Sequence, residues 1–99
     1  MKCLPEPPFA RLRVLVHGRV QGVNFRSFVY THARALHLTG YVRNLEDGRT
    51  VQVVSEGQRA DLEQLLEHLR EGPRGARVDG VDVRWGEANG SYRDFSLTH

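Results

Sequence analysis

The sequence has 99 residues and a net charge of +2, which allows one modest domain and is too small a charge to indicate nucleic-acid binding by itself. Its single cysteine, Cys3, has no partner in the chain, so no intrachain disulfide can form, and this favours a reducing compartment such as the cytoplasm. Residues 1–9 lack the apolar run of a signal peptide, and no later stretch is long enough to span a bilayer. No membrane partner is therefore expected.

The charged residues are distributed unevenly along the chain. Between Pro7 and Leu45 there are six arginines and no acidic residue, whereas eleven of the twelve acidic residues fall at or after Glu46. The first half of the chain should therefore carry a positive field that favours anionic ligands. A general preference for arginine on solvated faces is the alternative explanation, and it accounts less well for the absence of acids.

The first elements follow from proline content and periodicity. Residues 1–9 are predicted to be a flexible proline-rich tail, because proline removes backbone donors and restricts the residue before it, and residues 10–99 are predicted to form one domain. Alternating polar and apolar residues predict a strand over residues 11–17. After a glycine-bearing loop over residues 18–23, Asn24 is placed to act as the N-cap of a helix.

This first helix should end by Gly40. Leucines at helical spacing predict a second helix that stops at Gly72 and Pro73. Further strands are predicted over residues 41–45, 51–55 and 81–85, with a tight turn at 46–48 and a short closing strand at 95–97.

The order β-α-β-β-α-β predicts the α+β class. The expected fold is a ferredoxin-like split β-α-β sandwich, with an antiparallel sheet that carries both helices on one face. This architecture hosts enzymes, RNA binders and regulatory modules alike, so the fold alone does not define the function.

The loop before the first helix has the composition of an anion-binding site. A loop that leaves a strand and opens a helix points several backbone N–H groups at one spot, and the helix dipole adds positive charge there. Gly18 and Gly22 allow the backbone to curl, and Arg26 can place a planar guanidinium over the same point. For an arbitrary pair of glycines at this spacing, a plain tight turn with a surface arginine would be the better interpretation.

Two motifs resemble those of one known family. Residues 18–26 (GRVQGVNFR) closely resemble the first signature of the acylphosphatase family, and residues 40–44 (GYVRN), followed by LEDG, resemble the second. The resemblance covers the chain from Arg11 onward. It implies an enzyme, an acylphosphatase (acylphosphate phosphohydrolase), that hydrolyses acyl phosphates to a carboxylate and inorganic phosphate with no metal and no cofactor.

The resemblance also implies roles for individual residues. Arg26 is expected to bind the phosphate and Asn44 to orient the attacking water. The phosphate is expected to be held by the backbone amides of Gln21, Gly22, Val23, Asn24, Phe25 and Arg26. The expected partner is a small acyl phosphate, with inorganic phosphate or sulfate as competing anions, and a monomer is expected.

Two other functions remain alternatives. One is a non-catalytic anion-binding or regulatory module of the same fold, and the other is a weak nucleic-acid binder, which would lack stacking aromatics on its strands. The five histidines show no metal-ligand spacing, although His17 is placed to shape the loop, and Ser27 lacks the context of a nucleophile.

The hairpin departs from the family pattern at Thr50. The resemblance implies a hydrophobic residue two positions after the hairpin glycine, but here Thr50 stands there and Val51 follows, which predicts one inserted residue between Gly48 and Gly57. A register slip would turn every strand side chain to the opposite face. We expect the extra residue to be absorbed in the turn or as a bulge, leaving Asn44 in place.

Overall fold

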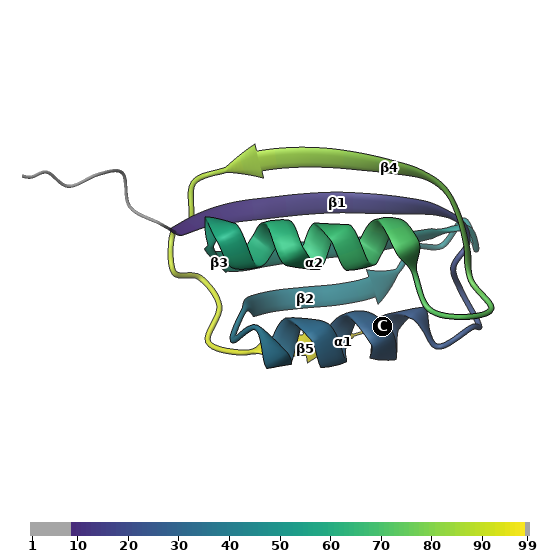
Figure 1. The fold of residues 1–99 in the computed structure, drawn as a ribbon, viewed down its shortest axis with the longest axis horizontal. Coiled ribbons are helices and arrows are strands. Elements are labelled where there is room, and N and C mark those ends of the chain that lie inside the picture. The colour runs from purple at the N-terminus through teal and green to yellow at the C-terminus, as the bar shows by residue number, and fades with distance from the viewer. Residues whose placement is uncertain (1–8, 99) are drawn as a thin grey trace, which may run out of the picture.

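The computed structural model describes residues 9–98, which form a sheet with two helices on one face (Figure 1). Apart from Phe9, the predicted tail lies outside these residues. The elements are β1 (Phe9–Arg19), α1 (Phe25–Ala35), β2 (Thr39–Asn44), β3 (Thr50–Gln58), α2 (Arg59–Glu71), β4 (Arg77–Gly86) and β5 (Phe95–Leu97). Every predicted helix and strand is confirmed, and β1, β3 and β4 extend beyond their predicted ranges at both ends.

The sheet has the strand order β4-β1-β3-β2-β5. Four strands pair antiparallel, and β5 pairs parallel with β2. The ferredoxin-like α+β fold is confirmed, but the sheet is mixed rather than wholly antiparallel. The two edge strands are β4 and β5, so the chain crosses the sheet after β4 and returns as β5, which runs beside β2 in the same direction.

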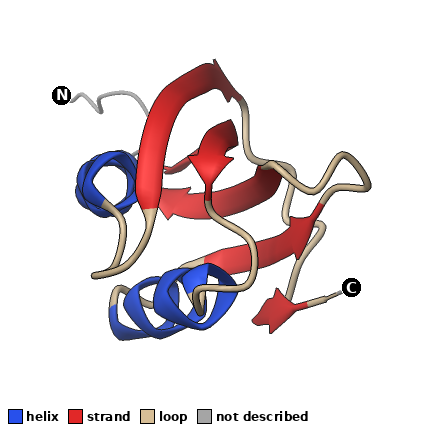
Figure 2. Cartoon of the chain, turned by 90° about the vertical axis from the view of Figure 1, so that its right-hand side faces the viewer, coloured by secondary structure: helices blue, strands red, loops and turns tan. Residues whose placement is uncertain are grey.

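Both helices pack on the same face of the sheet (Figures 1 and 2). Helix α1 contacts β2 and β5, and α2 contacts β1, β3 and β4. From α2, Leu62, Leu65 and Leu69 point at helical spacing into the core, where each is fully buried. Burial of such a side chain contributes about 1.5–3 kcal/mol, so this stripe anchors the helix. Within residues 9–98, neither helix has the length and apolar character needed to cross a membrane.

The other face of the sheet holds the crossover between β4 and β5. Glu56 of β3 is 4% exposed and forms an ion pair with Arg11, whose Nη2 lies 2.8 Å from Oε2. Its carboxylate also accepts hydrogen bonds from the backbone amides of Asn89 at 3.3 Å and Gly90 at 3.1 Å. A buried carboxylate satisfied in this way ties the crossover to the sheet and directs the chain toward β2.

The hairpin between β2 and β3 pairs in a single register. The register runs without a shift from Thr39 opposite Glu56 to Asn44 opposite Val51. No bulge is present in this pair of strands. Asn44 therefore stays at the end of β2, as expected.

Gly40 brings β2 and β3 close together. Its φ is +127°, and a Cβ at this position would lie 1.9 Å from the carbonyl oxygen of Val54. We expect Gly40→Ala to lower the free energy of unfolding by at least about 2 kcal/mol, measured by urea denaturation, because the backbone itself must move.

Gly80→Ala is the matched control, since Gly80 also lies in a strand but a Cβ there would meet nothing within 4 Å. It should stay within about 0.5 kcal/mol of the parent. Equal destabilisation by the two substitutions would contradict the close approach at Gly40.

Candidate active site

The loop between β1 and α1 presents backbone amides at the start of a helix. In the described part of the chain, no backbone–backbone hydrogen bond uses the amides of residues 22–25 as donors. Gly22 has a φ of +75° with open space beside it, and the first turn of α1 contains no acidic residue. Free amides and the positive end of the helix dipole together favour an anion at this point.

The predicted positions of Gly18 and Asn24 hold, with features that the sequence did not predict. Gly18 has a φ of +135°, and a Cβ there would lie 2.2 Å from the carbonyl oxygen of Arg77, so this glycine allows β4 to approach. Asn24 occupies the N-cap position as predicted, but it has a left-handed conformation with φ 63° and its side chain makes no capping hydrogen bond. Asparagine tolerates this conformation better than most residues.

A small pocket of about 220 Å³ lies beside this loop. It is lined by Val20, Gly22, Asn24, Phe25, Arg26, Ser27, Asn44 and Leu97. The two predicted catalytic residues, Arg26 and Asn44, therefore lie in one pocket although they come from different elements. Gln21 and Val23 are not among the residues that line it.

Asn44 is the last residue of β2, and its side-chain oxygen is the least satisfied polar atom of the pocket. Among the described residues, Asn44 Oδ1 is the only buried side-chain nitrogen or oxygen without a hydrogen-bond partner. An unsatisfied buried acceptor costs about 1–3 kcal/mol. Such a cost at a pocket wall is typical of an atom reserved for a ligand or a reacting water.

Arg26 is the second residue of α1, and its guanidinium reaches toward β5. Nη1 donates a 2.8 Å hydrogen bond to the carbonyl oxygen of Thr98. Thr98 is held there because its amide donates to the carbonyl oxygen of Val42 at 2.9 Å, which continues the parallel pairing of β5 with β2. The planar guanidinium carries five N–H donors, so one anchored nitrogen orients the whole group.

Gln21 connects the loop to the hairpin through its side chain. Nε2 donates to the carbonyl oxygens of Leu45 at 2.8 Å and Thr50 at 2.9 Å. Leu45 directly follows Asn44, and Thr50 is the first residue of β3, so the two carbonyls lie at the two ends of the hairpin turn. The side chain of Gln21 was missed as a connector because its partners are backbone atoms, for which a sequence carries no residue-type signal.

Asp47 closes the hairpin turn. Its Oδ2 accepts a 2.5 Å hydrogen bond from Thr50 Oγ1, and its Oδ1 accepts one from the Arg49 amide at 2.9 Å. The bond from Thr50, followed by that from Arg49, lowers the pKa of Asp47 below its ordinary value. This carboxylate therefore stays ionised well into the acidic range.

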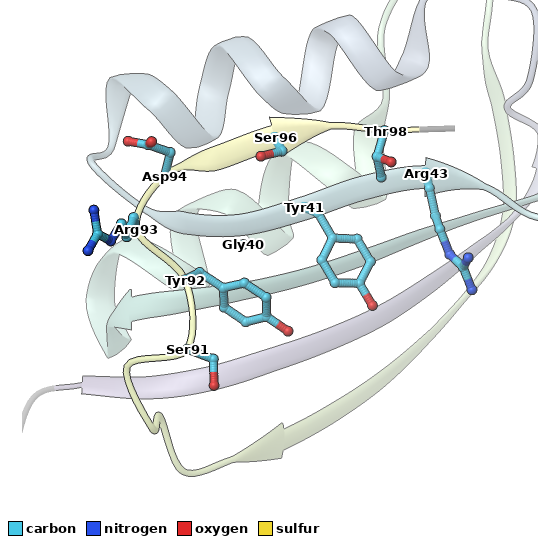
Figure 3. A pocket seen from close by; sticks show the side chains of 9 residues that line it. All are labelled: Gly40, Tyr41, Arg43, Ser91, Tyr92, Arg93, Asp94, Ser96 and Thr98. Atoms are coloured by element: carbon cyan, nitrogen blue, oxygen red, sulfur yellow. The ribbon is translucent and has the colours of Figure 1, made fainter.

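A larger hollow, of about 630 Å³, lies on the sheet face away from the helices (Figure 3). Tyr41 and Tyr92 form its aromatic wall, with ring centroids 5.9 Å apart. Both rings are half-buried, as expected for rim aromatics. Neither Arg26 nor Asn44 lines this hollow, so the predicted catalytic pair lies in the smaller pocket.

Comparison with known proteins connects this geometry to a family. The family model described as Acylphosphatase matches residues 12–97. The chain belongs to the acylphosphatase family. The activity of the family is hydrolysis of acyl phosphates to a carboxylate and inorganic phosphate, and the prediction of an enzyme of this kind is confirmed.

Individual acylphosphatases are similar over nearly the whole domain. One from Thermus thermophilus is 55% identical over 80 residues, covering 81% of this chain and 90% of its own. One from Roseiflexus is 48% identical over 88 residues, covering 89% and 94%. The crystal structure of acylphosphatase from Bacillus subtilis superposes with a TM-score of 0.86 at 33% identity, covering 91% of this chain and 99% of that one.

Proposed function

We propose that this acylphosphatase carries out its reaction in the pocket between the β1–α1 loop and the end of β2. The substrate phosphoryl group binds at the start of α1 under the guanidinium of Arg26, and Asn44 holds the attacking water. The observation that carries this proposal is the buried, unbonded Oδ1 of Asn44 in the same pocket as Arg26.

Hydrolysis in this pocket requires mainly positioning and charge stabilisation. The water oxygen forms a bond to phosphorus while the bond from phosphorus to the carboxyl oxygen breaks, and the carboxylate leaves with the electron pair. A carboxylate is a good leaving group, so little general-acid help is needed. Arg26 and the loop amides meet the charge on the phosphoryl oxygens.

Asn44 positions the water without acting as a base. A carboxamide oxygen accepts a hydrogen bond from the water, which leaves a lone pair of the water oxygen free for phosphorus. The carboxamide does not take up the proton, so the departing proton goes to the phosphate group itself or to solvent. The amides of Gln21, Gly22, Val23, Asn24, Phe25 and Arg26 are proposed to line the phosphate cradle.

The reaction is proposed to need no metal or other cofactor. Within residues 9–98, no group of three or more His, Cys, Asp or Glu side chains is arranged to hold a metal ion.

We also propose that the enzyme is a cytoplasmic monomer. The comparisons do not favour a non-catalytic module or a nucleic-acid binder, since these acylphosphatases match over 90% and 94% of their own lengths.

Phosphate release from acetyl or benzoyl phosphate tests this function directly. Activity is expected to survive a chelator and to be inhibited competitively by phosphate and by sulfate, because the cradle should accept any tetrahedral dianion. The measurement is the initial rate with EDTA present and a series of anion concentrations. Loss of turnover with EDTA that zinc or magnesium restores would contradict metal independence, and non-competitive inhibition would contradict the cradle.

A further inference from the structure

Four side chains form a hydrogen-bonded chain at the end of the sheet that carries the site. His17, directly before Gly18, lies between β4 and β3: its Nε2 is 2.9 Å from Asp82 Oδ2, and its Nδ1 is 3.2 Å from Thr50 Oγ1. Thr50 Oγ1 in turn donates to Asp47 Oδ2. The chain joins three strands and the hairpin turn.

Counting the hydrogens in this chain indicates which ring nitrogens of His17 donate when all three hydrogen bonds are made. The Asp47 carboxylate is ionised and accepts only, so the single hydrogen of the Thr50 hydroxyl is used toward it. Thr50 Oγ1 can then only accept from His17, which places a hydrogen on Nδ1. The carboxylate of Asp82 likewise requires a hydrogen on Nε2. Both ring nitrogens are donors, and this is the imidazolium form.

Thr50 transmits this arrangement to the catalytic pocket. Thr50 is 3% exposed, and its carbonyl oxygen accepts from Gln21 Nε2 and from the Leu45 amide, both at 2.9 Å. Gln21 belongs to the loop beside the pocket, and Leu45 directly follows Asn44. A shift of Thr50 therefore moves the loop and the asparagine relative to each other.

We propose that His17 is a positioning residue for acyl phosphate hydrolysis, which acts as an imidazolium through Thr50 to hold the hairpin turn against the β1–α1 loop. The inference rests on the proposed site, because its effect is exerted on Asn44 and on the loop. His17 touches neither the substrate nor the reacting atoms.

Loss of the His17 proton changes the partner of Thr50. Once Nδ1 is a lone pair, it competes with Asp47 for the only hydrogen of the Thr50 hydroxyl. A bond formed to His17 releases Asp47 and loosens the turn. The positioning contribution is therefore present while both ring nitrogens carry hydrogens, and it is lost when Nδ1 gives up its hydrogen.

Two carboxylates belong to the hydrogen-bonded chain of His17. Asp82 on β4 and Asp47 on the hairpin are both acidic, and Gly80, directly opposite on β4, has no side chain. The nearby Asp79 carboxylate forms ion pairs with two arginines. Its Oδ2 lies 3.8 Å from Arg49 Nη2, and its Oδ1 lies 3.3 Å from Arg77 Nε.

Nuclear magnetic resonance of the ring nitrogens tests the charge independently of activity. In 15N-labelled enzyme at its optimal pH, both His17 nitrogens should carry a hydrogen, with the signal assigned by its absence in His17→Gln. The backbone amides of residues 47–50 should shift with the same midpoint as the ring. In Thr50→Val the ring should still titrate while these amides no longer follow. A neutral ring at that pH, or hairpin amides that do not follow the ring, would overturn the proposal.

Kinetics test the link to catalysis. The wild type should lose kcat/KM on the alkaline side at the midpoint found for the ring, by about fivefold, as for one hydrogen bond. His17→Gln should show the lowered kcat/KM at all pH values, without the loss on the alkaline side. The control is His37→Asn, which removes an exposed histidine whose positive φ asparagine tolerates. This variant should retain the loss of kcat/KM on the alkaline side.

An unchanged pH profile in His17→Gln would overturn the positioning role. An inactive wild type would instead refute the proposed function, while the NMR measurements would still report on the His17 chain. The two failures are therefore distinguishable.

Discussion

Replacing Asn44 by alanine is expected to lower kcat by about 10² to 10³ while KM changes little. The side chain is proposed to hold water rather than substrate, so phosphate should still bind while the attack loses its alignment. Its Oδ1 is buried with no bonding partner among the described residues, so alanine removes no protein hydrogen bond of that atom. The measurements are steady-state kinetics, phosphate binding by calorimetry and the free energy of unfolding.

Asn89→Ala is the matched control, because it removes an asparagine that lines neither pocket. It should retain wild-type kcat, with only a small loss of stability, since its Oδ1 accepts from the Ser91 amide at 3.0 Å. A folded Asn44→Ala variant with normal turnover would show that Asn44 is structural.

Arg26→Lys is expected to lower kcat/KM by at least about 10², with effects on both kcat and KM. A lysine ammonium is a point charge that cannot reproduce a planar two-point contact with phosphate, and each lost hydrogen bond to a charged group costs roughly 1.5–3 kcal/mol. The substitution also removes the geometry of the bond from Nη1 to the Thr98 carbonyl, so the remaining charge is less well placed. Steady-state kinetics with benzoyl phosphate measure the effect.

Arg34→Lys on the same helix is the control for a general loss of arginine. Arg34 donates to the Tyr30 hydroxyl at 2.7 Å, and its side chain is exposed. Activity should stay within about twofold of wild type, since exposed contacts contribute little. Wild-type kinetics in Arg26→Lys would mean that Arg26 is peripheral and that phosphate binds elsewhere.

Much of the fold was predictable because local patterns agreed with the tertiary structure. The spacing of Leu62, Leu65 and Leu69 predicted the buried stripe of α2, since a helix repeats its faces every three to four residues. The motifs that contain Arg26 and Asn44 predicted a common site, and both residues line one pocket. They meet because the β1–α1 loop and the β2–β3 hairpin lie at the same end of the sheet.

The direction and partner of β5 were not predictable. Two apolar residues in a three-residue strand, Phe95 and Leu97, carry no signal for parallel pairing. Contacts with backbone carbonyls were not predictable either. The carbonyl oxygen of Thr98 accepts from the Arg26 guanidinium, and any residue type at position 98 would offer the same acceptor. The His17 chain was hidden for another reason: it joins residues 65 positions apart, His17 and Asp82, through a strand pairing that only the folded sheet creates.

The contribution of β5 to the pocket has a consequence for protein synthesis. Both helices and the strands β1 to β4 are complete by Gly86, whereas Leu97 lines the pocket and the Thr98 carbonyl anchors Arg26. Because a domain emerges from the ribosome beginning at its amino end, the core can collapse while the wall of the pocket is still inside the exit tunnel. A chain held on the ribosome by a carboxyl-terminal linker, with residues up to Gly86 outside the exit tunnel and Leu97 and Thr98 still inside it, should therefore be compact yet inactive, and hydrolysis should begin only when residue 98 has emerged.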